Sequence, residues 1–178
     1  MANIKWNLDP THSEIQFKVK HLMITNVTGS FNEFLVEAES ADEKFNSPNV
    51  SFSAKIASIN TSNEQRDAHL KGADFFDAEK FPEVRFASTD AKNHDEDGNF
   101  DLVGNLTLKD VTKSITLKVE FGGVAKDPWG NVKAGFTVSG KINRTDFGLT
   151  WNAPIETGGV LVSEDVKLFA EIQLVKAS

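Results

Sequence analysis

Strict alternation of apolar and polar residues runs through almost the whole chain, and it constrains the fold more than any other feature. Ile15, Phe17 and Val19 alternate with polar residues, for example, and the same period of two recurs in each later segment. Such alternation is typical of antiparallel strands with one face in a core and one face in water. The pattern predicts about nine strands, at residues 4–8, 15–20, 34–38, 50–56, 84–86, 100–108, 115–121, 134–142 and 166–174.

Turn-forming sequences separate these runs, so the strands are connected as a meander. Asp97 and Gly98 lie between two alternating runs, as in a hairpin, and a second turn spans residues 127–131. A meander of this many strands closes into a barrel or folds into a sandwich, and periodicity alone does not separate the two. Gly104 and Gly140 fall on the inward face of long strands, where glycine marks a bend or a close approach, and this favours a barrel.

One segment interrupts the alternation and predicts a short helix between two strands. Thr61 and Glu64 fit a capping box, with Ser62 and Gln65 as the competing pair, and Gly72 suits the left-handed position after the last turn. A helix this short is marginal by itself, so it must dock on the rest of the protein. This insertion is where we expect a functional site.

Composition excludes several classes of function. The 178 residues fit one domain, residues 1–178, with a sizeable core. A net charge of −7 without any basic run argues against nucleic acid and anionic lipid surfaces as partners. No window approaches the apolar length of a membrane span. Without cysteine, and with four histidines that lack metal-ligand spacing, we expect no disulfide, no metal and no cofactor.

The first residues of the chain bear on its location in the cell. The sequence Met-Ala-Asn-Ile-Lys-Trp has no apolar signal core. We therefore expect either a cytoplasmic protein or the mature form of an exported, periplasmic one.

The aromatic residues point to a hydrocarbon interior. The chain has 14 Phe and 3 Trp but no Tyr. A buried tyrosine hydroxyl needs a hydrogen-bond partner, whereas a phenylalanine ring does not. So many rings without hydroxyls fit either a large apolar channel or an ordinary phenylalanine-rich core.

The polar residues near the predicted helix allow two interpretations. Arg66, Asp67 and His69 fit an acid–base cluster, because histidine titrates near neutrality and an aspartate can orient it. They also fit a local network that holds the helix on the barrel, and their spacing favours this second interpretation. His21 continues the inward phase of Phe17, so it is either a polar group at a pocket mouth or a strand-end histidine.

Short motifs in a fixed order resemble those of the YceI-like, polyisoprenoid-binding family. They are WxLDxxHS at 6–13, FxVxH at 17–21, GxF at 29–31, RDxHL at 66–70, DFFD at 74–77, FP at 81–82, GxLTL at 104–108 and RxDFG at 144–148. The resemblance covers nearly the whole chain. It implies a lipocalin-like antiparallel β-barrel of about eight strands, with the helical insertion near one mouth. It also implies a long apolar channel for polyisoprenoids or related amphiphiles, including prenylated quinones.

On this basis we expect a non-enzymatic binding or carrier protein that holds a polyisoprenoid or prenylated quinone in its barrel. Its apolar lining is predicted to comprise Phe17, Val19, Phe34, Phe52, Ile56, Phe86, Leu106, Leu117, Phe136 and Ile142. The mouth is predicted to be shaped by Phe75, Phe76 and Phe81. The head group is predicted to meet His21, Arg66, His69 and Arg144, since arginine suits a phosphate.

Two other functions remain open on the sequence. One is a lipid-modifying enzyme that uses His69 or His21 as a base, with Asp67 as the orienting group. The other is a stress-response protein whose phenylalanine-rich barrel is solidly packed and takes no ligand. A homodimer is also open, because unclosed strand edges pair across a two-fold axis.

Overall fold

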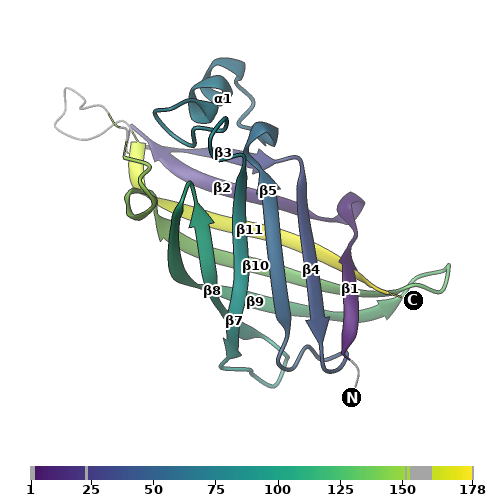
Figure 1. The fold of residues 1–178 in the computed structure, drawn as a ribbon. Helices are drawn as coiled ribbons and strands as arrows, with labels where there is room; N and C mark the ends of the chain where they lie inside the picture. The colour runs from purple at the N-terminus through teal and green to yellow at the C-terminus, as the bar shows by residue number, and fades with distance from the viewer. Residues whose placement is uncertain (1–2, 23, 151, 153–161, 178) are drawn as a thin grey trace.

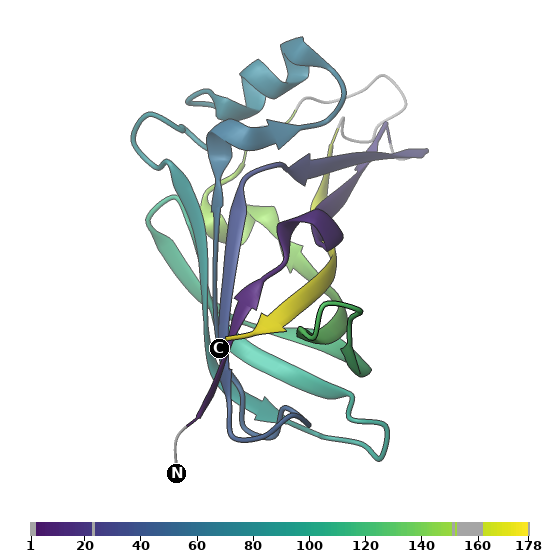
Figure 2. The ribbon, with the colours of Figure 1, turned by 90° about the vertical axis from the view of Figure 1, so that its right-hand side faces the viewer.

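The wall of the protein closes on itself, because its first strand hydrogen-bonds to strands on both sides (Figures 1 and 2). β1 (Ile4–Leu8) pairs with β4 (Phe34–Ser40) on one side and with β11 (Val162–Lys176) on the other. Round the wall the order is β1–β4–β5–β7–β8–β9–β10–β11 and back to β1. The predicted antiparallel barrel of about eight strands is therefore confirmed, and the sandwich is excluded. This computed structural model describes residues 3–22, 24–150, 152 and 162–177.

The remaining elements follow the meander that the sequence predicts, with one helix inserted between strands. They are β2 (Glu14–His21), β3 (Thr25–Phe31), β5 (Asn49–Lys55), β6 (Ile59–Asn60), α1 (Glu64–Lys71), β7 (Glu83–Lys92), β8 (Phe100–Leu108), β9 (Val111–Lys126), β10 (Val132–Asn143), and the 3₁₀ turns η1 (Pro10–His12), η2 (Ile56–Ser58) and η3 (Arg144–Phe147).

Three wall strands are broken, which explains why the sheet contains eleven strands although the ring has eight positions. η1 separates β1 from β2, Asn32 and Glu33 separate β3 from β4, and η2 separates β5 from β6. As a result, β11 pairs with β1 near its end and with β2 near its start. Beyond the breaks, β2, β3 and β6 continue the wall on the side where α1 lies (Figure 2).

Strand β3 was not among the predicted strands, because a glycine interrupts its apolar alternation. A Cβ atom at Gly29 would lie 2.2 Å from Cζ of Phe17 on the neighbouring strand, so the ring packs directly over the glycine backbone. The glycine that interrupts the alternation of β3 thus leaves the space on one face of the sheet that the ring of Phe17 fills.

Gly104 and Gly140 show the close approach that their inward positions predict. A Cβ atom at Gly104 would lie 2.4 Å from Cζ of Phe86, and one at Gly140 would lie 2.5 Å from Cδ2 of Leu117. Each glycine makes room for a large side chain from the neighbouring strand, which lies across the glycine backbone.

An aromatic cluster fills the half of the barrel away from α1. Phe45 enters from the β4–β5 loop, and its ring centre lies 4.8 Å from that of Trp6, 4.7 Å from that of Phe136 and 5.7 Å from that of Phe121. Trp6 and Phe45 are fully buried. The indole N–H of Trp6 donates to Oγ of Ser40 at 2.9 Å, so its polar atom is satisfied in the core.

Helix α1 forms where the sequence predicts, but its caps differ from the predicted ones. The N-cap is Asn63, whose side chain accepts a hydrogen bond from the backbone N–H of Arg66. Thr61 does not cap the helix, because its hydroxyl is taken up by other partners. Gly72 has φ −80° and ψ 177°, which is extended backbone and not the predicted left-handed conformation. Phe75 is buried beyond the helix end, in agreement with an anchoring role.

No helix within the described part of the chain is long and apolar enough to span a bilayer.

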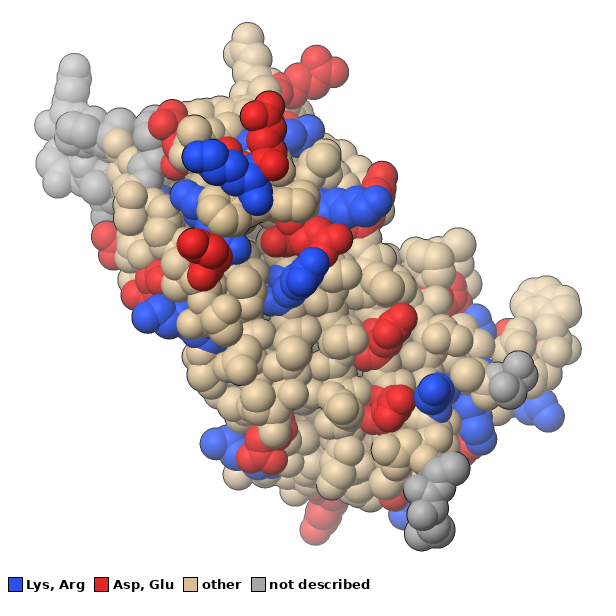
Figure 3. Space-filling view, in the orientation of Figure 1, with Lys and Arg blue, Asp and Glu red and all other residues tan. Residues whose placement is uncertain are grey.

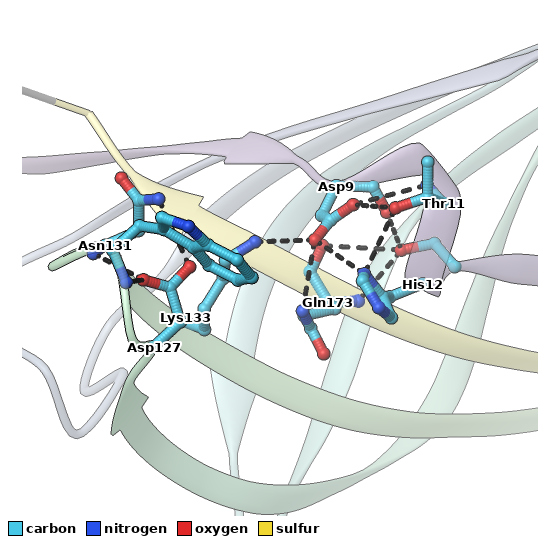
Figure 4. A network of polar contacts seen from close by, with 9 residues as sticks. Asp9, Thr11, His12, Asp127, Asn131, Lys133 and Gln173 are labelled. Atoms are coloured by element: carbon cyan, nitrogen blue, oxygen red, sulfur yellow. Dashed lines mark hydrogen bonds and ion pairs between the residues drawn. The ribbon is translucent and has the colours of Figure 1, made fainter.

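The break between β1 and β2 is fastened to the barrel by Asp9 (Figure 4). Oδ2 of Asp9 accepts hydrogen bonds from Nζ of Lys133 on β10 at 2.6 Å, from Nε2 of Gln173 on β11 at 3.1 Å and from Nδ1 of His12 at 2.9 Å. Its Oδ1 accepts from the N–H and the hydroxyl of Thr11. The hydrogen bond from Lys133 is the main cause that holds the pKa of Asp9 well below its ordinary value, despite burial.

We predict that Asp9→Asn destabilises the barrel by about 2 kcal/mol at pH 7, because the amide cannot accept all of these hydrogen bonds. A carboxylate with a lowered pKa contributes stability above its unfolded pKa of about 4 and loses it as the pH falls toward the folded value. The difference in unfolding free energy between wild type and variant should therefore shrink between about pH 4 and pH 2. Urea denaturation at several pH values measures it.

Asp90→Asn, at an exposed position on β7, is the control for the loss of one negative charge. If both variants lost equal stability, or if the effect of Asp9→Asn did not change with pH, the role given to Asp9 would be wrong.

Candidate functional site

A cavity of about 390 Å³ occupies the half of the barrel nearest α1. Its size falls within the range of about 300–1,000 Å³ that is usual for small-molecule sites. Its wall is mainly hydrocarbon from strands β2 to β5 and β7 to β11, with α1 and the following loop at one end. The exposed residues Lys20 and Arg66 belong to its rim, so the cavity reaches the surface there.

Most of the predicted apolar residues do line this cavity. Strand alternation directs the lining residues of β2, β5, β8, β9 and β10 inward, and the loop after α1 contributes two rings. The predicted residues found in the cavity wall are Phe17, Val19, Phe52, Phe75, Phe76, Leu106, Leu117 and Ile142.

Three predicted lining residues lie elsewhere although they are deeply buried. Phe136 packs within the aromatic cluster in the opposite half of the barrel. The ring of Phe86 lies across the backbone at Gly104 and is not part of the described cavity wall. Ile56 falls in η2, where the strand breaks and alternation no longer decides which way a side chain faces.

Two further predicted residues lie in other parts of the surface. Phe34 begins β4 just after a strand break and lines a shallow outer groove, with its ring 6.5 Å from that of Phe52. Phe81 lies in a tight turn, where its N–H donates to the carbonyl of Asp77 at 2.9 Å, and it is half-buried outside the described cavity wall. Phe34 keeps the phase of Val36 on β4, so alternation gives its side of the strand but not whether it borders the cavity, whereas the placement of Phe81 depends on a local turn.

The list of predicted lining residues was also incomplete. Aliphatic residues of the same inward faces also line the cavity, although the prediction emphasised phenylalanine and did not include them; examples are Leu102, Ile115, Val138, Leu168 and Ile172. The alternation pattern contained all of these. Val27, Phe31, Leu70 and Leu149 carried no such signal, because they lie in segments that the pattern did not assign to strands.

The four predicted head-group residues come together at this cavity. His21 ends β2, Arg66 and His69 lie on α1, and Arg144 begins η3. Lys20 joins them at the rim, and no aspartate or glutamate occurs among the described residues of the wall. The cavity of an acidic protein therefore has a polar rim that is rich in hydrogen-bond donors.

Thr61 joins α1 to the end of β6 through a network of hydrogen bonds. It is 4% exposed. Its hydroxyl donates to Oδ1 of Asp67 at 2.6 Å and accepts from Nε of Arg66 at 2.7 Å, and its carbonyl accepts from Nη2 of Arg66 at 2.6 Å. Its backbone N–H also donates to Asp67. The network that holds the helix on the barrel, which the spacing favoured, is what the structure contains.

The predicted pairing of His69 with Asp67 is not formed, because Asp67 is occupied by Thr61. Nε2 of His69 instead lies 3.0 Å from Oδ2 of Asp74 in the following loop. The His69 ring meets Phe75 edge-on, with 5.1 Å between ring centres. His69 and Asp74 together therefore hold the loop that carries Phe75 and Phe76 against the helix.

Arg144 is buried beside the cavity and holds backbone carbonyls. Its Nε donates to the carbonyl of Ser163 at 2.8 Å, its Nη1 to that of Leu149 at 2.6 Å and its Nη2 to that of Val162 at 3.3 Å. Burial lowers the pKa of the Arg144 guanidinium, and the charge of Glu164 partly offsets this. These contacts give Arg144 a structural role in joining η3 to the start of β11.

In Figure 3, acidic and basic side chains are interspersed around the α1 end, while the face over β7 and β8 shows few charges. The charges around the cavity rim therefore belong to a mixed surface on this face of the molecule.

The fold and the cavity define a lipocalin-like β-barrel with an internal apolar site. The chain belongs to the YceI family: the family model described as "YceI-like domain" matches residues 6–174. A UPF0312 protein of Staphylococcus aureus (strain MSSA476) is 38% identical over 169 residues, which cover 94% of this chain and 95% of the relative.

Solved structures show the same fold. A YCEI protein of Campylobacter jejuni is 37% identical with a TM-score of 0.75, over 96% of this chain and 97% of that one. BcnA of Burkholderia cenocepacia has a TM-score of 0.78 at 19% identity, over 93% and 98% of the two chains. A polyisoprenoid binding domain from Saccharophagus degradans has a TM-score of 0.66 at 14% identity, over 97% and 98%. The last two likenesses concern the fold alone.

We predict that Thr61→Val lowers the unfolding free energy by about 1–3 kcal/mol, because it leaves Asp67 and Arg66 without their shared hydroxyl in a buried place. Thermal or urea denaturation measures the loss. Thr28→Val, at an exposed site on β3, is the isosteric control and should change stability little. Equal effects of the two variants would contradict the anchoring role of Thr61.

Proposed function

We propose that this chain is a non-enzymatic carrier that holds one polyisoprenoid chain, such as the tail of a prenylated quinone, inside the barrel. The observation that carries this proposal is the cavity of about 390 Å³ with an almost purely hydrocarbon wall inside a closed barrel. A polar ligand would find no hydrogen-bond partners in that wall, whereas a hydrocarbon chain removes apolar surface from water along its whole length.

The energetics favour a long apolar chain over a small polar substrate. Each buried methylene group contributes about 0.8 kcal/mol, so one five-carbon isoprene unit contributes roughly 3 to 4 kcal/mol before the costs of binding. A few units suffice for tight binding without any special contact to the head group. The shape of the cavity, and not a set of polar contacts, would then select the ligand.

The rim supports placing the head group at the α1 end. His21 and Lys20 supply donors around an opening that has no carboxylate in its described wall, and Arg66 and His69 lie beside them while they also bond Thr61 and Asp74. Quinone carbonyls and phosphates are hydrogen-bond acceptors, so either head group suits these donors.

Two alternatives receive less support from the structure. An enzyme built on His69 and Asp67 lacks its dyad, because Asp67 is bonded to Thr61 and His69 to Asp74. A solidly packed barrel is inconsistent with the cavity in the half of the interior nearest α1. A carrier is therefore the function that the geometry supports best.

Native mass spectrometry of the purified protein, followed by organic extraction, tests this proposal directly. We predict that Leu117→Asn, in the cavity wall, weakens binding of an added prenylated quinone at least tenfold, because it places an amide against the chain. Thr116→Asn, exposed on the other face of β9, is the matched control and should bind normally. Circular dichroism first establishes that both variants are folded. Unchanged binding by a folded Leu117→Asn protein would contradict binding in this cavity.

We also predict that His21→Ala weakens binding of a prenylated quinone about three- to tenfold, the value of one hydrogen bond. Binding of a hydrocarbon such as squalene, which has no head group, should not change. His94→Ala, in an exposed hairpin, is the control. Fluorescence titration with the two ligands measures the difference. Equal losses for both ligands would show that His21 shapes the cavity and does not meet the head group.

A further inference from the structure

The cavity ends abruptly partway down the barrel, at the same level on neighbouring strands. On β10 the inward residue Val138 lines the cavity, while Phe136, the next inward residue, lies below it. On β8 the wall includes Leu102 and stops before Phe100, within the residues described. Ile172 lines the cavity and pairs across the sheet with Phe136. The aromatic cluster therefore begins just below the last lining residues, and none of its rings belongs to the described cavity wall.

Phe45 differs from the other members of the aromatic cluster because it lies in a loop and not on a wall strand. Its ring lies 4.7 Å from that of Phe136, edge to face, and it is 2% exposed. The other members, Trp6, Phe121 and Phe136, are strand residues whose backbone holds the barrel together. Phe45 lies in a loop, so its side chain can be changed without removing a strand residue of the wall.

The loop that carries Phe45 is shaped to insert this ring. Phe45 has φ +59°, a conformation that a bulky side chain rarely adopts and that surrounding contacts must hold. Asp42 supplies those contacts: its Oδ1 accepts from the N–H groups of Lys44 and Asn46, and its Oδ2 accepts from the side-chain amide of Asn46. Oγ of Ser40, which accepts from Trp6, donates to the carbonyl of Asp42 at 2.7 Å.

We propose that Phe45 is a specificity-determining residue that limits the length of isoprenoid chain the barrel accepts. This inference rests on the proposed function and adds to it the feature that selects among ligands of one class. A chain that enters past the α1 rim runs down the apolar wall until its end reaches the last lining residues, Val138 and Ile172, behind which the rings of Phe136 and Phe45 fill the barrel. Longer chains leave their additional units outside the cavity, where they gain nothing.

The test is a series of prenyl alcohols that lengthen by one isoprene unit, with dissociation constants measured by native mass spectrometry or fluorescence titration. For the wild type, affinity should rise ~10-fold or more with each added unit until the chain reaches the end of the cavity, and then level off. In Phe45→Leu, which removes the ring and keeps an apolar side chain, the plateau should move to a chain at least one unit longer. Phe147→Leu, equally buried in η3 outside the described cavity wall, is the matched control and should keep the wild-type plateau.

A second variant tests the opposite change in cavity depth and leaves the β4–β5 loop unaltered. Val138→Phe places a ring directly above Phe136 and should move the plateau to a shorter chain. Wild-type plateaus in folded Phe45→Leu and Val138→Phe proteins would overturn the role of Phe45 while leaving the carrier function intact. If the wild type bound none of the alcohols, the carrier function would fail as well, so the two failures are distinguishable.

Discussion

Pairing of β1 with both β4 and β11 is the interaction on which the rest of this structure depends. It turns a meander with two free edges into a ring, in which each of the eight strands β1, β4, β5, β7, β8, β9, β10 and β11 has a partner on both sides. β1 is only five residues long, and the 3₁₀ turn η1 interrupts the strand soon after it. Asp9 holds the break against β10 and β11, so one carboxylate on the outer face supports the closure of the barrel.

Closure allows one interior to be packed in one half and hollow in the other. Empty apolar space costs stability, because the side chains around it lose contacts. The aromatic cluster around Phe45 and the continuous hydrogen bonding of the wall offset this cost at the far end. The hollow half is then available for a ligand, and the proposed isoprenoid chain would restore the missing contacts.

The α1 segment shows how the same residue types serve structure where the sequence also allowed chemistry. Arg66 and Asp67 meet at the Thr61 hydroxyl, and His69 turns to Asp74. Each polar group of the predicted acid–base cluster is therefore engaged in holding the helix and its loop over the cavity rim. The site that results is a shaped opening with donors around it, which suits recognition of a head group.

The sequence by itself determined the strand pattern, the helical insertion and most of the inward faces, because alternation and turn chemistry are local properties. The choice of a barrel over a sandwich came from two inward glycines and the family resemblance, since closure pairs strands that are far apart in the chain. Only the tertiary structure decided where the interior is empty. Phe136 and Leu117 have the same inward phase, yet one lies in the packed cluster and the other in the cavity wall. Phe136 packs against Phe45, which a loop inserts from outside the alternating pattern, and alternation within the strands does not reveal this contact.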